Sequence, residues 1–122
     1  MSRVLTFELP WPPSVNTYWR NITVNGRGRT VISVAGRKYK REVSIRFHLA
    51  TKMMGRLAVE IDAFPPDHRA RDLDNLLKSL FDACTAAGVW GDDSQIDQIT
   101  VKRGNVVENG FVVLYVREIQ KP

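Results

Sequence analysis

Three aspartates and one lysine have the types and spacing that phosphate chemistry requires. Asp72 and Asp74 stand one residue apart, Lys78 follows four residues after Asp74, and Asp93 comes later in the chain. Magnesium prefers oxygen ligands, and it usually takes one or two carboxylates together with water and substrate phosphate. A nearby lysine could stabilise the charge that develops on a scissile phosphate. These residues therefore allow a site for metal-dependent cleavage of a phosphodiester.

The same residues also allow a purely structural interpretation. Asp72 and Asp74 fall at the start of an expected helix, where a carboxylate can accept hydrogen bonds from free N–H groups and suits the helix dipole. Lys78 could form an ion pair with Asp74, worth a few tenths of a kcal/mol. Asp82 falls on the polar face of the helix and is expected to be solvated. Spacing alone leaves both interpretations open.

The position of Asp93 raises a geometric question. Apolar residues recur at spacings of three and four and predict one helix, which begins near Leu73 and ends at Gly88. A helix of ~15 residues is ~22 Å long. Asp93 lies just beyond Gly88, so it can approach Asp72 in only two ways. Either the following segment folds back along the helix, or the site combines two subunits, and the sequence does not decide between them.

Other elements follow from periodicity. Alternating residues predict strands over 3–9 and 57–64, and short apolar runs predict strands at 30–32, 96–103 and 111–118. The last two flank Asn109-Gly110, a strong turn signal, which predicts an antiparallel hairpin.

A second helix is expected over 33–54, with Ser33 as N-cap and Gly55 just past its end. Its apolar stripe consists of Tyr39, Val43, Phe47, Ala50 and Met54. Residues 14–29 are rich in Asn and Gly and are predicted to form a loop.

Length and composition limit the class of protein. The 122 residues suit one compact domain over 1–122 of the α+β or mixed α/β class. A hydrophobic content of 43% argues against disorder, and no run approaches the ~18 apolar residues of a membrane helix. The single cysteine, Cys84, cannot form an internal disulfide, and no signal-peptide core follows the N-terminus. We therefore expect a cytoplasmic protein with no membrane association.

The charge is unevenly distributed along the chain. The total is +5, but residues 1–50 carry nine Lys or Arg and two Asp or Glu, a net charge of +7. Residues 51–100 carry five Lys or Arg and nine Asp or Glu, a net charge of −4. A basic surplus favours an anionic partner, whereas the acidic cluster would repel it unless cations neutralise the carboxylates.

The expected loop interleaves aromatic and basic side chains. Arginines there could contact phosphates, and exposed Trp11 or Trp19 could stack on bases. Equally, both tryptophans could belong to the core while the arginines are simply solvated. The candidate DNA-binding residues from the loop, the first helix and the segment before Asp72 are Arg20, Arg27, Arg29, Arg37, Lys40, Arg69 and Arg71.

Several motifs together resemble the RusA family of Holliday junction resolvases, which occurs in phages, prophages and some bacteria. The resemblance keeps the order and spacing of these motifs over nearly the whole chain. The motifs are Leu9-Pro10-Trp11-Pro12-Pro13-Ser14 with Asn16, Arg71-Asp72-Leu73-Asp74-Asn75-Leu76 with Lys78, Phe81-Asp82-Ala83 with Gly88-Val89-Trp90, and Asp92-Asp93. In combination they are specific, although an Asp-x-Asp alone is not.

This resemblance implies a mixed β-sheet with two main helices, and a homodimer that nicks two opposing strands of a four-way DNA junction. It further implies that Asp72, Asp74 and Asp93 bind Mg²⁺, for which Mn²⁺ could substitute, and that Lys78 assists catalysis. Bound metal would let a phosphate join the acidic cluster as a ligand. A dimer would supply two sites related by two-fold symmetry.

The function expected from the sequence is therefore a Mg²⁺-dependent, structure-selective endodeoxyribonuclease that resolves Holliday junctions by paired symmetric incisions in recombination and repair. Two alternatives are a basic DNA-binding protein without catalysis and a nuclease for other branched DNA. Metal-dependent nicking of a four-way junction would exclude the non-catalytic DNA-binding protein. Cleavage rates on four-way junctions compared with other branched DNA would distinguish the nuclease of the second alternative.

Overall fold

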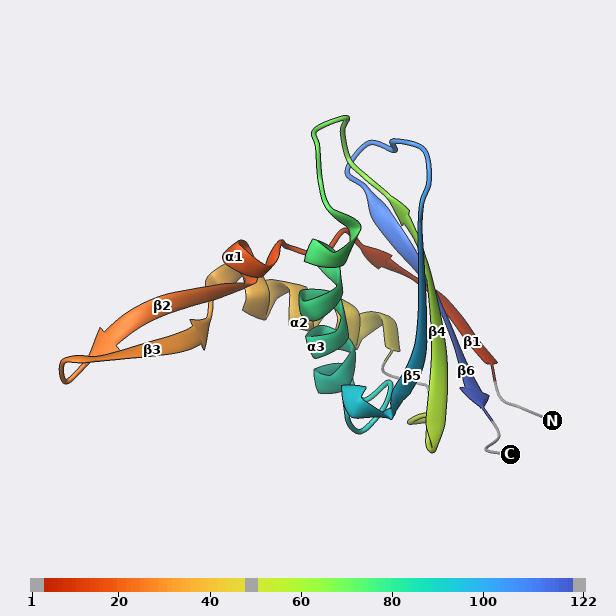
Figure 1. Cartoon of the computed structure of the whole chain (residues 1–122), viewed down its shortest axis with the longest axis horizontal. Coiled ribbons are helices and arrows are strands. Elements are labelled where there is room, and N and C mark those ends of the chain that lie inside the picture. Colours follow the sequence, from red (N-terminus) through yellow and green to blue (C-terminus); the bar gives the residue numbers. More distant parts are fainter. Residues whose placement is uncertain (1–3, 48–50, 120–122) are drawn as a thin grey trace.

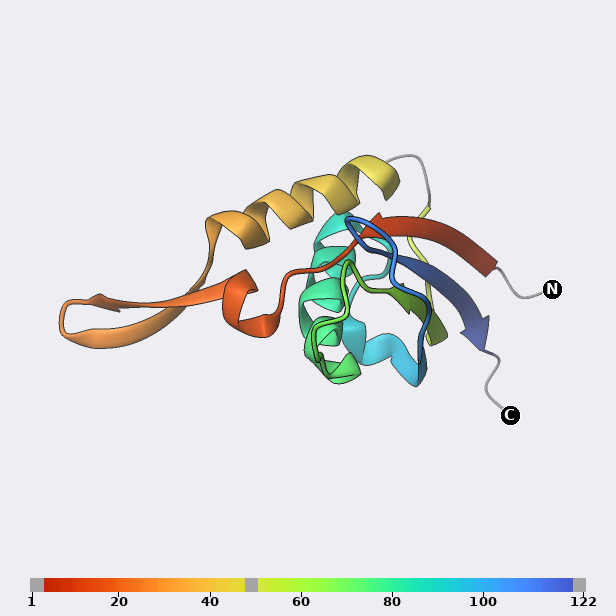
Figure 2. The same ribbon diagram turned by 90° about the horizontal axis from the view of Figure 1, so that it is seen from above.

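Two layers make up the body of the molecule in the computed structural model, which describes residues 4–47 and 51–119 (Figures 1 and 2). Within those residues, four strands form one sheet in the order β1-β6-β4-β5. Helices α2 (Val34–Phe47) and α3 (Leu77–Ala87) lie together on one side of it. The strands are β1 (Val4–Pro10), β4 (Arg56–Phe64), β5 (Ile96–Arg103) and β6 (Phe111–Ile119). The α+β class with a mixed sheet and two main helices is confirmed.

The pairing of the sheet differs from the expected hairpin of residues 96–103 and 111–118. Strand β4 lies between β5 and β6, pairing in parallel with the first and antiparallel with the second. The connection after β5 is instead tied to the end of β4, because the amide of Gly104 donates to the carbonyl of Ala63 at 2.7 Å. Asn109 and Gly110 do form a turn with positive φ, but it belongs to this longer connection. The hairpin prediction was therefore wrong.

One hydrophobic core joins the sheet to the helices. Every second residue along the central strands points toward the helices, so that Ile61 and Leu114 are almost fully buried. Val43 from α2 and Leu80 from α3 meet them, and Trp90 fills the core beyond the end of α3. This core fixes α3 against the sheet.

Helix α2 begins as expected and ends earlier. Ser33 caps it, with the Ser33 hydroxyl oxygen accepting from the amide of Gly36 at 3.0 Å. Tyr39, Val43 and Phe47 form its buried stripe, as predicted. Residues 51–54 are not helical, and Met54 is 66% exposed, so the extension of the helix to Met54 was wrong. Ala50 lies outside the described residues.

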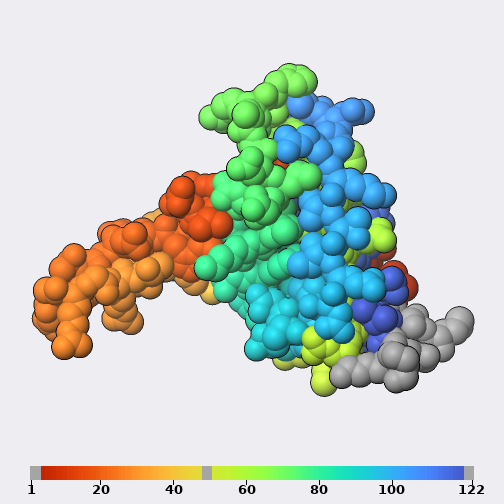
Figure 3. Space-filling model, viewed as in Figure 1, coloured from red at the N-terminus to blue at the C-terminus, as the bar shows by residue number. Residues whose placement is uncertain are grey.

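A projecting arm replaces the expected loop at 14–29. It consists of a short helix α1 (Val15–Tyr18) followed by the antiparallel strands β2 (Trp19–Val24) and β3 (Arg27–Ile32). Asn25 and Gly26 both have positive φ at its tip, as a two-residue hairpin turn requires. The hairpin extends away from the body, as Figures 1 and 3 show. The loop prediction was wrong because the Asn-Gly signal was overlooked.

The helix expected from Leu73 to Gly88 is present with a tighter first turn. A 3₁₀ turn, η1 (Leu73–Leu76), leads into α3, and Gly88 ends α3 with φ 86°. A second short 3₁₀ turn, η2 (Asp93–Gln95), leads into β5. None of the helices in the described part of the chain is long and apolar enough to cross a membrane.

Candidate active site

The carboxylates of Asp72 and Asp74 lie exposed at the start of η1. Asp72 occupies the N-cap position, but its side chain accepts no capping hydrogen bond. Neither carboxylate forms a hydrogen bond or ion pair with any other residue in the described ranges. Capping therefore does not account for these side chains, and both are available to a ligand.

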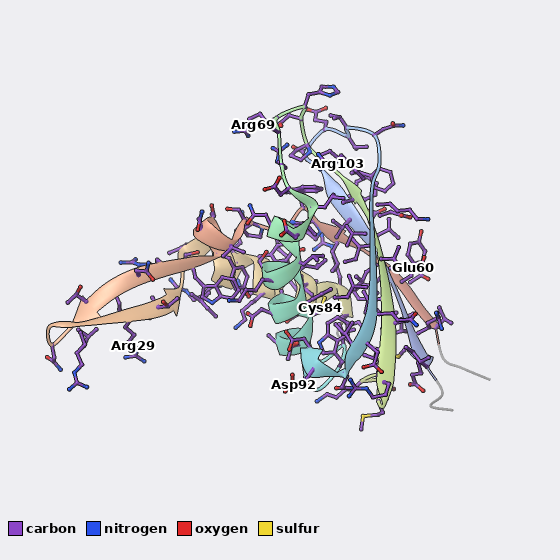
Figure 4. All side chains as sticks on the ribbon, viewed as in Figure 1. Arg29, Glu60, Arg69, Cys84, Asp92 and Arg103 are labelled. Carbon is purple, nitrogen blue, oxygen red and sulfur yellow. The ribbon has the colours of Figure 1, made fainter. Side chains whose placement is uncertain are left out.

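A clamp of arginines fixes the backbone just before Asp72. Arg71 donates from Nη1 to Asp67 Oδ1 at 2.7 Å, and Arg69 donates from Nη2 to Asp67 Oδ2 at 3.1 Å. These hydrogen bonds hold the pKa of Asp67 well below its usual range. Arg103, at the end of β5, donates from Nη2 to the carbonyl of Arg71 at 2.7 Å. Figure 4 shows Arg69 and Arg103 at this same end of the molecule.

Lys78 points toward the arm instead of pairing with Asp74. Its ammonium nitrogen lies 5.1 Å from the centre of the Trp19 ring, a cation–π contact. No ion pair between Lys78 and Asp74 exists within the described residues. An open cleft of about 600 Å³ runs between the arm and α3, and Lys78, Trp19 and Arg20 contribute to its lining. The lysine is thus positioned where a DNA strand could pass.

Asp82 has a structural role that the sequence did not reveal. Instead of being merely solvated, it accepts a hydrogen bond from the hydroxyl of the buried Tyr18 at 2.5 Å. Burial, together with this carboxylate, raises the pKa of Tyr18 far above its ordinary value. Lys40 of α2 lies 3.9 Å from the same carboxylate. Asp82 therefore links α1, α2 and α3 beneath the arm.

Asp92 and Asp93 lie at the far end of α3, where Figure 4 labels Asp92. The Asp92 carboxylate accepts from the amide of Ser94 at 2.9 Å, and this bond lowers its pKa. The pKa of Asp93 is raised, first by partial burial and then by the neighbouring Asp92 and Asp82. Partial burial and nearby negative charge thus both disfavour the ionised form of Asp93.

The chain does not bring Asp93 next to Asp72. The segment after Gly88 reaches Asp93 before β5 begins, and only β5 carries the chain back toward the start of α3. Asp93 precedes the first residue of β5, whereas Asp72 adjoins the last, Arg103. Because β5 has 8 residues, its ends lie roughly 23 Å apart at ~3.3 Å per residue. Within residues 4–47 and 51–119, no three His, Cys, Asp or Glu side chains gather in a way that could hold a metal ion.

The candidate DNA-binding residues fall on three surfaces. Strand pairing in the arm places three of them on one face of the hairpin, where all are exposed and no acidic residue accompanies them. Two more lie on α2, and two lie in the loop before Asp72. The residues are Arg20, Arg27 and Arg29 on the arm, Arg37 and Lys40 on α2, and Arg69 and Arg71 in the loop.

Comparison with known proteins identifies the family of the chain. The family model described as "Endodeoxyribonuclease RusA" matches residues 10–114. The chain belongs to the RusA family. A relative from Enterobacteria phage HK97, named crossover junction endodeoxyribonuclease rusA, is 41% identical over 120 residues, which cover 93% of this chain and 94% of the relative. Relatives of the same name from Shigella sonnei and Escherichia coli K12 are each 40% identical over 117 residues, again 93% of this chain and 94% of the relative. The resemblance found in the motifs is thereby confirmed.

Proposed function

We propose that the protein is a Mg²⁺-dependent endonuclease that resolves four-way DNA junctions by paired symmetric incisions during recombination and repair, in the cytoplasm of a bacterium or a phage-infected host. One observation carries this proposal. Asp72 and Asp74 present two unpartnered carboxylates beside an arginine clamp, in a chain whose relatives are named crossover junction endodeoxyribonucleases.

The donor set fits magnesium. Asp72, Asp74 and Asp93 offer carboxylate oxygens, the ligands that this hard cation prefers, and Mn²⁺ could take its place. The raised pKa of Asp93 fits a group whose charged form is stabilised when a cation is present. When bound, the ion would polarise the scissile phosphate and lower the pKa of the attacking water.

The protein's own groups would orient the substrate. Arg71 directly precedes Asp72, and Asp67 holds Arg69 next to Arg71, so the two guanidinium groups can hold the DNA backbone near the cut. Lys78 can stabilise negative charge on the phosphate from the arm side of α3. The carboxylate of Asp67 keeps both arginines in place before DNA arrives.

The wide separation of Asp93 from Asp72 supports a homodimer with shared active sites. Strand β5 is an edge of the sheet, and its outer backbone groups have no strand partner among the described residues. Ile99, at the middle of β5, is 48% exposed. Antiparallel pairing of two β5 strands about a two-fold axis near Ile99 would bring the start of one strand beside the end of the other. Asp93 of the second copy would then approach Asp72 and Asp74 of the first.

This arrangement also accounts for paired incisions. Two identical sites related by a two-fold axis suit a substrate whose opposing strands have the same symmetry. The opposite edge, β1, would not have this effect, because β6 and β4 separate it from β5 and the Asp93 segment. The basic arm and α2 would contact phosphates of the four duplexes and give affinity that falls with salt.

The direct test is cleavage of a labelled four-way junction by the purified protein, with and without Mg²⁺ or Mn²⁺. We expect metal-dependent symmetric nicks, and we expect Asp72→Asn, Asp74→Asn and Asp93→Asn to abolish them while junction binding persists. Asp62→Asn is the matched control, because Asp62 lies in β4 with its side chain directed away from the helices.

Each alternative has its own outcome in this test. Binding with no metal-dependent nicking by the wild-type protein would identify a non-catalytic DNA-binding protein. Equal cutting of three-way junctions or flaps would identify a nuclease of broader branched-DNA specificity. Undiminished cleavage by all three Asn variants would refute the site.

A further inference from the structure

A small apolar cleft opens directly beside Asp72. Its volume is about 220 Å³, and its walls are largely apolar. Trp11, Pro12 and Pro13 form one wall, and Leu73 and Leu76 of η1 form the other. The volume lies below the roughly 300 Å³ at which pockets for drug-sized ligands begin, so the cleft suits a single ring system.

Hydrogen bonds hold the proline wall of the cleft in place. The carbonyl of Pro10 accepts from the hydroxyl of Tyr39 at 2.8 Å, and the carbonyl of Pro13 accepts from the hydroxyl of Ser79 at 2.5 Å. Both donors belong to buried residues of the helix layer. A preformed cleft loses little conformational freedom when a ligand enters, which favours binding.

Charged and polar groups surround the mouth of the cleft. Asp72, Arg71 and Arg103 all contribute to its lining. The guanidinium carbon of Arg71 lies 5.9 Å from the centre of the Trp11 ring. Asn75 is exposed at the rim, and its side-chain amide makes no hydrogen bond within the described ranges. The mouth therefore combines a phosphate-binding cation with an amide that can pair with a base edge.

We propose that this cleft binds one unstacked nucleobase of the DNA, from a nucleotide next to the scissile phosphate. The planar ring would lie against Trp11, while its phosphate stays outside near Arg71 and Asp72. This inference rests on the proposed function, because it takes Asp72 to mark the cleavage site. A base inside a duplex must be extruded at a cost, whereas a base at a branch point has already lost part of its stacking. The cleft would thus favour junctions over duplex DNA.

The test uses four-way junctions with an abasic nucleotide at single positions around the cut. For the wild-type protein, one position next to the scissile phosphate should lower the single-turnover cleavage rate by about tenfold, as expected when one base–aromatic stack is lost. Trp11→Leu should cut the intact junction more slowly and show no further loss at that position. We call the loss of rate caused by the missing base the abasic penalty. Trp11→Phe keeps an aromatic face and should retain this penalty.

A second variant avoids any loss of folding at the partly buried Trp11. Asn75→Trp adds a ring from the exposed rim, so it should occupy the cleft and abolish the abasic penalty. Asn105→Trp is the matched control, because Asn105 is exposed but does not line this cleft. It should keep the penalty.

Binding gives a readout that does not depend on cleavage. A junction with 2-aminopurine at the sensitive position should change fluorescence with the wild-type protein and with Asn105→Trp, but not with Asn75→Trp. A fluorescence change without metal-dependent cleavage would refute the proposed function and support the cleft. Two results would refute base binding in the cleft and leave the proposed function intact. One is cleavage with no abasic penalty at any position, and the other is a penalty that persists in both Trp11→Leu and Asn75→Trp. A change of oligomeric state in Asn75→Trp, with the penalty intact, would mean that a second copy occupies the cleft instead.

Discussion

Mixing two inactive variants gives the sharpest test of a shared active site. One chain carries Asp72→Asn and the other carries Asp93→Asn, and we expect each to be inactive alone. If Asp72 of one copy works with Asp93 of the other, a mixed dimer has one site with both substitutions and one intact site. Activity should therefore reappear on mixing, although no chain in the mixture is wild type.

The size of the effect follows from the separation of the two residues. Asp93 precedes β5 and Asp72 adjoins its end, so the two cannot meet within one chain. Random exchange of subunits makes about half of the dimers mixed, and each has one intact site, so about one quarter of all sites should recover. The assay is nicking of an end-labelled four-way junction after equimolar subunit exchange. The product should be nicked and unresolved, because resolution needs two cuts.

A matched mixture provides the control. Asp72→Asn and Asp74→Asn lie in the same half of each site, so every site in that mixture carries a substitution and activity should stay absent. The reasoning is refuted if the Asp72→Asn and Asp93→Asn mixture remains inactive although exchange is demonstrated. It is equally refuted if both mixtures recover to the same extent.

Three further predictions concern the arm and the core. Replacing Arg27 and Arg29 with Ala should reduce the salt dependence of junction binding by about one unit of log–log slope per lost phosphate contact, measured by titration at several salt concentrations. Gly36→Ala should destabilise the fold and loosen the arm, because an added Cβ would lie 2.5 Å from the carbonyl oxygen of Tyr18; thermal unfolding and proteolysis of the arm would report this. Burial raises the pKa of the Cys84 thiol, so the native protein should resist thiol labelling at pH 8, and the free energy of unfolding should fall as the pH rises above ~8.5, where the unfolded chain loses its thiol proton.

Each of these expectations has a clear contrary result. An unchanged salt slope would place Arg27 and Arg29 away from the DNA. Wild-type stability of Gly36→Ala would mean that the contact between α2 and the base of the arm can relax freely. Labelling of Cys84 at the rate of a free thiol, without unfolding, would show that the end of α3 opens in the native state.

Sequence periodicity was sufficient to predict the helices whose apolar residues form one regular stripe against the core. The apolar spacing from Leu73 to Cys84 located α3 almost completely, since its buried residues face one layer of the protein. Ser33 marked the start of α2 for the same local reason. The end of α2 was missed because Met54 continues the period in sequence but is exposed in the structure.

Pairings between distant segments could not be predicted from such patterns. Residues 96–103 and 111–118 are consecutive strands, yet β4 lies between them, parallel to β5 and antiparallel to β6. A parallel pair needs a long crossover, here through α3, and has no short turn signal of the kind that marks a hairpin. The hydrogen bond from Tyr18 to Asp82 joins residues 64 positions apart, and no local signal indicates it. The helix length did indicate that Asp93 would be remote from Asp72, but only the structure showed that the chain turns back after Asp93, along β5, and not before it.

The length of the arm can vary independently of the candidate active site at Asp72 and Asp74. Tyr18 ties the base of the arm to the body, because its carbonyl accepts from the amide and the hydroxyl of Ser33 at 2.9 Å and its hydroxyl donates to Asp82. From there to the turn at Asn25-Gly26, β2 and β3 pair with each other and with no other strand among the described residues. Adding or removing one residue pair would change the reach of the arm by ~3.4 Å and leave the register at its base intact. If the arm contacts DNA as proposed, the span that it covers can change in small steps during evolution without disturbing Asp72, Asp74 or the helix that follows them.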